Sequence, residues 1–355
     1  MAAAVPGATS RPRHLHPLAR YISVRLGISV ILVFGVTLVT FVLTNLVPAD
    51  PAQAALGERA ASDPEVVAAF RKAQGLDQPV AVQYLLYLGR LVQGNLGTST
   101  QTHNPVSSDL AVAFPATAEL ALFVVVLSIL LGVGGGMIAA MRHNRFTDRV
   151  IRMFSLIGIS IPTFWLALVV LFVFYYQLHW APGAGRLDPT AVAPPTVTGM
   201  YTVDAILAGQ WDLFGDALAH LALPGTVLTL YTVGLLVRFS RSAVLDVLNQ
   251  DFVLAARAKG LGTVSIAFRY ILRGASLPIL TVVGLAFGSL LSGTVLTEQV
   301  FGWGGIGQYA YKAATTLDLQ AVMGVGVTVG IVYILTNFVI DVVYGFIDPR
   351  VRVGS

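Results

Sequence analysis

Cysteine is absent from the 355-residue sequence, and charged residues are scarce. Without cysteine the chain can form no disulfide, no catalytic thiolate and no zinc site with thiolate ligands. Lysine occurs only at Lys72, Lys259 and Lys312, and none of the three is followed by Ser or Thr. A Walker A motif needs that pair, so this type of ATP site is excluded. The net charge of +4 is too small to indicate binding to nucleic acid.

The sequence contains long apolar runs and few of the charged residues that a soluble protein carries. Hydrophobic residues make up 55% of the sequence and charged residues 11%, whereas soluble domains have about 25% charged residues. The mean hydropathy is +0.76. A membrane-spanning helix needs roughly 20 consecutive apolar residues. The sequence therefore predicts an all-α integral membrane protein with six transmembrane helices, near residues 26–47, 120–141, 154–177, 217–237, 275–297 and 319–340.

Basic residues are distributed unevenly among the segments that join these runs. If the N-terminal segment is cytoplasmic, alternation places the segments near 142–152, 238–273 and 348–355 on the same side. These four segments hold 16 of the 22 basic residues, and the opposite side holds six basic and twelve acidic residues. The positive-inside rule therefore predicts that both termini are cytoplasmic.

The predicted domain boundaries follow from this topology. The long segment after the first run has two helix signals. Asp63 and Pro64 predict the start of a helix that ends at Gly75, and a second amphipathic helix is predicted from Asp77 to Gly94. The expected parts are a disordered cytoplasmic tail (1–20), the first transmembrane helix (21–47), an extracytoplasmic helical insertion (48–113), a transmembrane core with a cytoplasmic loop at 241–274 (114–347) and a cytoplasmic C-terminus (348–355).

The stretch FGWGGIG, residues 301–307, matches the G-x-G-x-x-G pattern that cradles a dinucleotide pyrophosphate. That pattern has this meaning only between a strand and a helix of a βαβ unit. Here it follows the fifth apolar run on the outer side, so we predict a structural turn in which Phe301 or Trp303 fills the interface. Two G-x-x-x-G patterns predict close helix packing: Gly132 with Gly136, and Gly326 with Gly330.

The cytoplasmic loop between the fourth and fifth runs contains DFVLAARAKGLG at residues 251–262. Asp251 can cap a short helix, to which the alanines give a narrow face. Gly260 and Gly262 permit a sharp turn into a second helix. A short helix with small residues and a few cations can seat in a groove of another protein. The loop thus predicts a docking element through which a partner moves the membrane domain.

This loop resembles the coupling loop of permease subunits of ATP-binding-cassette importers, which has the form E-A-A-x-x-x-G. Ala255, Ala256 and Gly260 match the form, whereas Leu254 stands at the glutamate position. The stretch AARAKGLG is similar to the branch that carries dipeptides and oligopeptides. Further segments resemble the first permease subunit of this branch, at residues 74–99, 104–120, 160–168, 298–324 and 348–352.

The resemblance implies the transmembrane subunit of an ATP-driven peptide importer in the bacterial inner membrane. The implied partners are a second homologous permease, two cytoplasmic ATP-binding-cassette ATPases, an extracytoplasmic solute-binding protein, the peptide and membrane lipid. The partner ATPases would hydrolyse ATP, so the chain is expected to be no enzyme and to need no cofactor or metal. The residues expected to couple to the ATPases are Asp251, Ala255, Ala256, Arg257, Lys259, Gly260 and Gly262. Those expected at an outer gate or along the pathway are Phe301, Trp303 and Asp318.

Three alternatives remain. A permease of the same branch for nickel, glutathione or a haem-like solute would have nearly the same sequence, although nickel would favour more histidines along the path. A secondary transporter would need paired buried charges and an inverted repeat, which the sequence does not show. An intramembrane serine protease would need Ser289 or Ser292 to face His220, and no G-x-S-x-G pattern supports such a site.

Overall fold

The computed structural model describes residues 17–46 and 62–347, and the chain there is almost wholly helical. Within these residues one isolated β-bridge joins Thr98 to Pro105. The predictions for residues 1–16, 47–61 and 348–355 lie outside the described residues. The elements, with short π-helical stretches labelled η, are α1 (Pro17–Leu46), α3 (Pro64–Gln74), α4 (Val80–Val92), α5 (Val106–Ser128), η1 (Ile129–Val133), α6 (Gly134–Met141), α7 (Phe146–Ser160), α8 (Thr163–Val170), η2 (Leu171–Gln177), α9 (Tyr201–Leu207), α10 (Trp211–Leu248), α11 (Asp251–Ala258), α12 (Thr263–Ile266), η3 (Ala267–Ile271), α13 (Leu272–Gly293), α14 (Val295–Phe301), α15 (Ile306–Thr315) and α16 (Leu319–Ile347).

Five helices of the described chain are long and apolar enough to cross a membrane. They are α1, the helix formed by α5, η1 and α6, then α10, the helix formed by α12, η3 and α13, and α16. A sixth candidate is the pair α7 and α8–η2, which is bent at a short break. The described part of the chain thus has five candidate spans, or six if the bent pair counts as one.

The expected third run, residues 154–177, is not one straight helix. α7 ends at Ser160 and α8 begins at Thr163, after a bend of 97°. Pro162 has no backbone N–H and disfavours the helical conformation of the residue before it. Ile161 is accordingly extended, with φ −89° and ψ 126°. Hydropathy reports how apolar the run is but not its direction, so the bend was not predicted.

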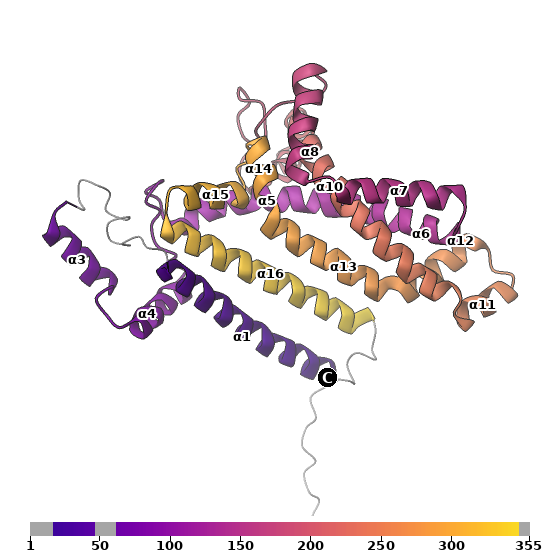
Figure 1. The fold of residues 1–355 in the computed structure, drawn as a ribbon, viewed down its shortest axis with the longest axis horizontal. Helices are drawn as coiled ribbons and strands as arrows, with labels where there is room; N and C mark the ends of the chain where they lie inside the picture. Colours follow the sequence, from indigo (N-terminus) through magenta and orange to yellow (C-terminus); the bar gives the residue numbers. More distant parts are fainter. Residues whose placement is uncertain (1–16, 47–61, 348–355) are drawn as a thin grey trace, which may run out of the picture.

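α10 is the centre of the helical bundle. It packs against α5, α6, α7, α8 and α13, while α16 lies between α13 and α1 (Figure 1). The two glycine patterns confirm the predicted close packing. A Cβ on Gly136 would lie 2.7 Å from Ser240 Cβ of α10, and one on Gly330 would lie 2.4 Å from Val36 Cγ1 of α1.

The two ends of the bundle carry different elements. α3, α4 and α15 lie at one end, called the α15 end below, and α11 and α12 lie at the other, the α11 end (Figure 1). Near the α11 end, Asp148 at the start of α7 is fully buried. Its carboxylate accepts from Arg241 Nε at 2.8 Å and from Arg241 Nη2 at 3.0 Å. This bidentate ion pair fixes the start of α7 to α10.

The helices between the first and second spans agree with the predicted ones, with one shift. Asp63 is the N-cap of α3 and accepts from the backbone N of Glu65, and Gly75 ends the helix in the left-handed conformation at φ 70°. α4 begins at Val80 rather than at Asp77. Pro79 is its N-cap, with an extended ψ of 144°.

Three helices extend beyond the boundaries expected from hydropathy. α1 begins at Pro17, so residues 17–20 of the expected tail are helical, and proline suits the first turn of a helix. α5 begins at Val106, inside the expected insertion, and α10 runs to Leu248, inside the expected loop at 241–274. Backbone hydrogen bonding continues past the end of an apolar run, which is why composition alone places these ends poorly.

Candidate functional site

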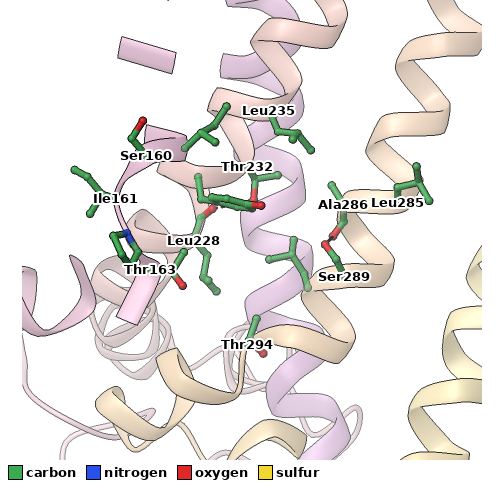
Figure 2. Close-up of a pocket in the computed structure, with 14 residues that line it drawn as sticks. Ser160, Ile161, Thr163, Leu228, Thr232, Leu235, Leu285, Ala286, Ser289 and Thr294 are labelled. Carbon is green, nitrogen blue, oxygen red and sulfur yellow. Dashed lines mark hydrogen bonds between the residues drawn. The ribbon is translucent and has the colours of Figure 1, made fainter. Parts of the chain in front are cut away.

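A cavity of about 670 Å³ lies between the break in α7–α8, the middle of α10 and the facing side of α13. Figure 2 shows residues of all three walls around it, with Ser160 and Thr163 at the break, Thr232 on α10 and Ser289 on α13. Leucines, isoleucines and Ala286 fill most of the surface between these hydroxyl groups. None of the described residues that line the cavity is Asp, Glu, Lys, Arg or His.

This lining favours passage over chemistry. An apolar surface with a few hydroxyl groups can hold a solute without selecting strongly for one side chain. Acid–base catalysis and metal binding need converging ionisable groups. The part of the chain that the structure describes contains no cluster of three His, Cys, Asp or Glu that could hold a metal ion.

The break between α7 and α8 brings irregular backbone to the cavity wall, since residues 159–163 line it. The first N–H groups of a helix have no partner within that helix. Pro162, the N-cap of α8, makes no side-chain hydrogen bond to them. Irregular backbone at membrane depth is tolerated where it is buried in protein or lines a water-filled cavity. The break thus places backbone groups that can bond to water or to a polar solute at the wall of this cavity.

The turn FGWGGIG joins α14 to α15 and packs on the bundle. Phe301 and Trp303 are both 1% exposed. Trp303 Nε1 donates to the Ala116 carbonyl oxygen of α5 at 2.8 Å, and Phe301 packs with Val227 of α10. These aromatic side chains fill the interface between the turn and the bundle. Their contact with a solute stays a prediction.

Glu298 lies fully buried beneath the turn and joins three elements. Its Oε1 accepts from the hydroxyl of Thr117 on α5 at 2.8 Å and from the hydroxyl of Thr294 at 2.7 Å. Its Oε2 accepts from the backbone N of Gln308 at 3.0 Å. The backbone N of Ile306 donates to Thr117 Oγ1 at 2.8 Å. The first N–H groups of α15 thus bind the Glu298 carboxyl and the hydroxyl beside it.

Two opposing effects act on the pKa of Glu298, and burial is the larger of them. Burial raises the pKa of Glu298 above its ordinary value, and the hydrogen bonds from Thr294, Thr117 and the start of α15 oppose that rise. Thr294 also lines the cavity described above. Glu298 therefore connects one end of the cavity to the turn and to α5.

The glycines of the turn allow this close approach. A Cβ on Gly305 would lie 2.3 Å from Thr117 Oγ1, and a Cβ on Gly307 would lie 2.7 Å from Val295 Cα. A glycine pattern that resembles a nucleotide cradle does bring a helix N-terminus to an acidic group. That group is the carboxyl of Glu298 in the same chain. The prediction of a structural turn is confirmed, with a partner that the sequence did not indicate.

Asp318 lies at the start of α16 and is 1% exposed. Its Oδ2 accepts from Ser99 Oγ at 2.6 Å and from the Thr100 backbone N at 2.9 Å, and its Oδ1 accepts from the Ala321 backbone N at 3.1 Å. Asp318 therefore caps α16 and anchors the segment that follows α4. A pathway role for Asp318 stays a prediction.

A buried ion pair that the sequence did not reveal holds the segment between η2 and α10. Arg186 Nη2 lies 2.6 Å from Glu119 Oε2 of α5, and the two side chains are 10% and 4% exposed. The Arg186 guanidinium also stacks over Tyr201, 3.7 Å from the ring centroid. The partners are 67 residues apart in sequence. The position of Glu119 near the end of a span was the one signal available.

The predicted coupling residues lie together at the α11 end. Of these residues Ala256 is buried, at 3% exposure; together with Val253 of the same helix it packs into a core that includes Ile271. The other predicted coupling residues are exposed along α11 and the turn after it: Asp251, Ala255, Arg257, Lys259, Gly260 and Gly262. The structure thus gives α11 one buried face and one face that is open to a partner.

Two details of this segment refine the prediction. Asp251 is not the helix cap, because Gln250 occupies the N-cap position with an extended ψ of 146°. Asp251 lies in the first turn instead, where a negative charge interacts favourably with the helix dipole. Gly260 has φ +74°, the left-handed conformation that a sharp turn needs, and Gly262 is the N-cap of α12.

His220 pairs with a carboxylate rather than with a nucleophile. Its Nδ1 lies 3.1 Å from Asp216 Oδ1, and the residue is 5% exposed. Ser289 Oγ donates to the carbonyl oxygen of Ala286 at 2.8 Å. These contacts give no support to a serine protease site at His220.

Two family models match the chain. Residues 132–353 match the binding-protein-dependent transport system inner membrane component, and residues 18–121 match the N-terminal part of the membrane component of such systems. Together the two matches include both the cavity and the α11 segment.

Similarity to curated proteins extends over most of the chain. The "Probable D,D-dipeptide transport system permease protein DdpB" of Escherichia coli (strain K12) is 43% identical over 92% of this chain and 95% of its own length. The di/tripeptide transport system permease protein DppB of Pseudomonas aeruginosa is 41% identical over 94% and 98%. The dipeptide transport system permease protein DppB of Alkalihalophilus pseudofirmus is 37% identical over 92% and 98%. An inward-facing structure of the MetNI methionine ABC transporter is similar at a TM-score of 0.47, which is too low to carry an argument.

Proposed function

The chain belongs to the family of binding-protein-dependent transport system inner membrane components, and from this premise we infer that it is the transmembrane subunit of an ATP-driven peptide importer. It is a multi-pass protein of the bacterial inner membrane and a non-catalytic permease, because partner ATPase subunits hydrolyse the ATP. The observation that carries this inference is the match to peptide permeases over at least 92% of the chain.

Short peptides are the proposed solute. All three relatives described above are named as permeases for dipeptides or tripeptides. The cavity of about 670 Å³ is large enough for a short peptide, and its hydroxyl groups and broken-helix backbone can bond to peptide amides. Because the lining is otherwise apolar and uncharged, it tolerates different side chains. Selectivity would then rest mainly with the binding protein that delivers the peptide.

The cavity supplies one half of the translocation pathway in this proposal. A second, homologous permease would supply the other half and complete the wall. α8 supports this arrangement because it stands out from the bundle (Figure 1) and exposes aromatic side chains such as Trp165, at 51%. Peptide would pass beside the α7–α8 break, where irregular backbone needs a polar neighbour.

The exposed face of α11 is the proposed docking site for a cytoplasmic ATPase. Phe252 and Leu254 are 46% and 48% exposed there, beside the cations Arg257 and Lys259. The buried face of α11 packs on the core formed by α10, η3 and α13. A push on α11 would therefore reach α13 and the cavity through packed side chains rather than through a flexible loop.

The proposed topology has six spans, with α7 and α8–η2 together as the third. The α11 end would face the cytoplasm with both termini, and α3 and α4 would form an extracytoplasmic insertion that meets the solute-binding protein. The distribution of basic residues supports this orientation, since 16 of 22 lie in the segments assigned to the cytoplasm.

The turn at residues 301–307 is the proposed outer boundary of the pathway. Phe301 and Trp303 would pack this turn against the bundle, and Asp318 would hold the segment that follows α4. Glu298 supports this role because it connects the turn to Thr294, which lines the cavity. A gate formed this way would move as a unit with α14 and α15.

Uptake of a labelled dipeptide into proteoliposomes tests the function. The vesicles would hold the assembled transporter with its ATPases, and uptake should require ATP and the solute-binding protein. Ala286→Trp should block uptake, because Ala286 is 5% exposed and lines the cavity. Val339→Trp is the matched control, at a site on α16 that is 58% exposed and does not line the cavity.

Two outcomes would contradict the proposal at different levels. Wild-type vesicles that take up dipeptide without ATP, or not at all, would argue against an ATP-driven peptide importer. Uptake that survives Ala286→Trp would leave the importer in place but would exclude this cavity as its pathway. Mass spectrometry of the purified complex should also find two ATPases and a second permease.

A further inference from the structure

The helix α4 is apolar on the face that its own bundle leaves uncovered. Val82, Leu85, Leu86 and Val92 are 38%, 66%, 45% and 88% exposed. Their spacing of three, four and seven residues places them along one side of the helix. A helix that meets water on one side carries polar residues there, whereas a helix that is apolar all round is enclosed by other apolar groups. The surroundings of α4 are therefore apolar on both sides.

The polar side chains of α4 other than its tyrosines are engaged by the chain itself. The Gln83 Nε2 amide donates to the carbonyl oxygens of Leu76 and Gln78 at 3.0 and 2.8 Å. Arg90, in the last turn, lines a cavity of about 420 Å³ together with the segment 95–103. Neither side chain interrupts the exposed apolar face.

The packed face of α4 meets α1 well inside the α1 span. The hydroxyl of Tyr84 is hydrogen-bonded to Thr37 Oγ1 at 3.0 Å. The Tyr84 ring also lies 5.7 Å from the ring centroid of Phe34 and 5.3 Å from that of Phe41. The span ends at Leu46, and these three contacts precede that residue by 12, 9 and 5 positions. At 1.5 Å per residue, α4 touches α1 about 8 to 18 Å inside its outer end.

The last span gives the same depth independently. Met323, Val327 and Ile331 of α16 form one hydrophobic cluster with the two tyrosines of α4. This span begins at Leu319, so the three residues follow its start by 4, 8 and 12 positions. The contacts with α16 thus lie about 6 to 18 Å inside the span. One leaflet contributes about 15 Å of hydrocarbon, so both spans place α4 at the depth of the acyl chains.

We propose that α4 is embedded in the bilayer leaflet at the α15 end, with phospholipid acyl chains against its exposed apolar face. With 13 residues α4 is too short to cross a bilayer. It would lie within one leaflet, as amphipathic interfacial helices do. Its backbone hydrogen bonds are formed within the helix, so the hydrocarbon costs it little there. In the proposed topology this is the extracytoplasmic leaflet, and only that assignment rests on the proposed function.

The exposed surface of α1 favours lipid over a protein as the occupant. Val39 and Leu43 of α1 are 57% and 59% exposed within the stretch that α4 contacts. The two helices therefore present one kind of apolar surface at one depth. A water-soluble protein would have to reach below the outer end of α1 to cover α4, whereas acyl chains surround a span at that level.

The neighbouring helix α3 has the surface expected of a helix in water. Glu65, Ala69 and Lys72 are exposed along one side of it, and α3 lies farther from the bundle than α4 (Figure 1). The insertion would thus be fixed to the membrane through α4, while α3 stays available to the solute-binding protein.

Spin labelling of the assembled transporter in phospholipid nanodiscs tests the proposal. The chain has no cysteine, so a single-cysteine variant carries one nitroxide on this subunit. The complex with the unsubstituted chain gives the background from partner subunits. Val82→Cys and Leu85→Cys place the label on the exposed face of α4. Leu43→Cys on α1 is the lipid reference, and Ala69→Cys on α3 is the water reference.

Power saturation compares collisions of the nitroxide with oxygen, which dissolves in lipid, and with a water-soluble nickel chelate. At Val82→Cys and Leu85→Cys, oxygen should collide more often than the chelate, as at Leu43→Cys, and the label should be mobile. At Ala69→Cys the order should be reversed. The two α4 positions keep the test valid if one variant fails to assemble.

Two results would overturn the proposal. A collision ratio at either α4 position equal to that at Ala69→Cys would place this face in water. An immobile label with few collisions of both kinds would place a protein there, and adding the solute-binding protein would show whether it is the occupant. Dipeptide uptake by wild-type vesicles is measured separately. Its failure would contradict the importer function without changing the position of α4, whereas a water-like α4 with normal uptake would contradict this inference alone.

Discussion

Gly305→Ala should release the turn at residues 301–307 from the bundle. The added Cβ would lie 2.3 Å from Thr117 Oγ1 and 2.6 Å from Glu298 Oε2. Reaching an ordinary contact of 3.4 Å needs a shift of about 1 Å, which follows from the distances just given. That shift would stretch the bonds to these oxygens from the backbone N of Ile306 and Gln308, now 2.8 and 3.0 Å, beyond hydrogen-bond length.

The expected cost combines overpacking with broken buried hydrogen bonds. Overpacking costs about 1–3 kcal/mol, and each buried group left without its partner costs about 1–3 kcal/mol. With two such groups the total is about 3–9 kcal/mol, which corresponds to amide exchange at Ile306 and Gln308 that is roughly 10² to 10⁶ times faster. Hydrogen exchange with mass spectrometry on the assembled complex measures this local opening directly.

Gly304→Ala is the matched control, one residue earlier. Gly304 has φ +73° but no atom within 4 Å of a built Cβ, so only backbone strain of roughly 1–2 kcal/mol is expected. Thr117→Ala removes the nearest oxygen, so Gly305→Ala should cost less in that background than alone. Equal exchange rates in Gly304→Ala and Gly305→Ala, or no relief from Thr117→Ala, would refute the account of the turn.

Three further predictions concern other parts of the chain. Asp148→Asn should destabilise the purified complex by about 3–5 kcal/mol, because it leaves Arg241 partly buried without its partner; a thermal midpoint equal to wild type would contradict this. Gly260→Ala, at φ +74°, should weaken co-purification of the ATPases, whereas Gly262→Ala, at φ −64°, should not. Burial raises the pKa of Asp204, but hydrogen bonds from the backbone N–H groups of residues 197–199 and from the Thr198 hydroxyl together lower it more, so its pKa lies below the ordinary value. The stabilisation that the Asp204 carboxylate gives to the folded protein is therefore present above about pH 4 and is lost as pH falls through the folded pKa. Protease accessibility of residues 197–207, measured from pH 6 to 2, should show this loss. Asp204→Asn should be cleaved readily throughout that range.

Local patterns predicted much of the fold. Apolar runs located the spans, Asp63 and Gly75 marked the ends of α3, and the glycine pairs marked helix contacts, since each signal lies within a few residues of the feature. The α11 segment was predictable for the same reason, with Gly260 at its turn. Helix ends were less accurate, because hydrogen bonding continues where apolar composition stops.

Contacts between distant residues were not predictable from one sequence. The hydrogen bond from Thr117 to Glu298 spans 181 residues, and the cavity is formed by three helices that are separated along the chain. The bend before α8 had a local signal in Pro162, but its 97° angle depends on packing against α10 and α14. The unbonded hydroxyl of Tyr87 was visible only in the folded chain.

The bent arm formed by α8 and η2 also has a consequence for the amounts of the two permease subunits in the cell. Phe172 and Tyr176 of this arm are 52% and 66% exposed, and the helix points away from its own bundle. A partner that binds only the folded chain stabilises it by mass action. We therefore expect copies made without the second permease to be short-lived, and synthesis of the two subunits in equal amounts to set how much of each survives.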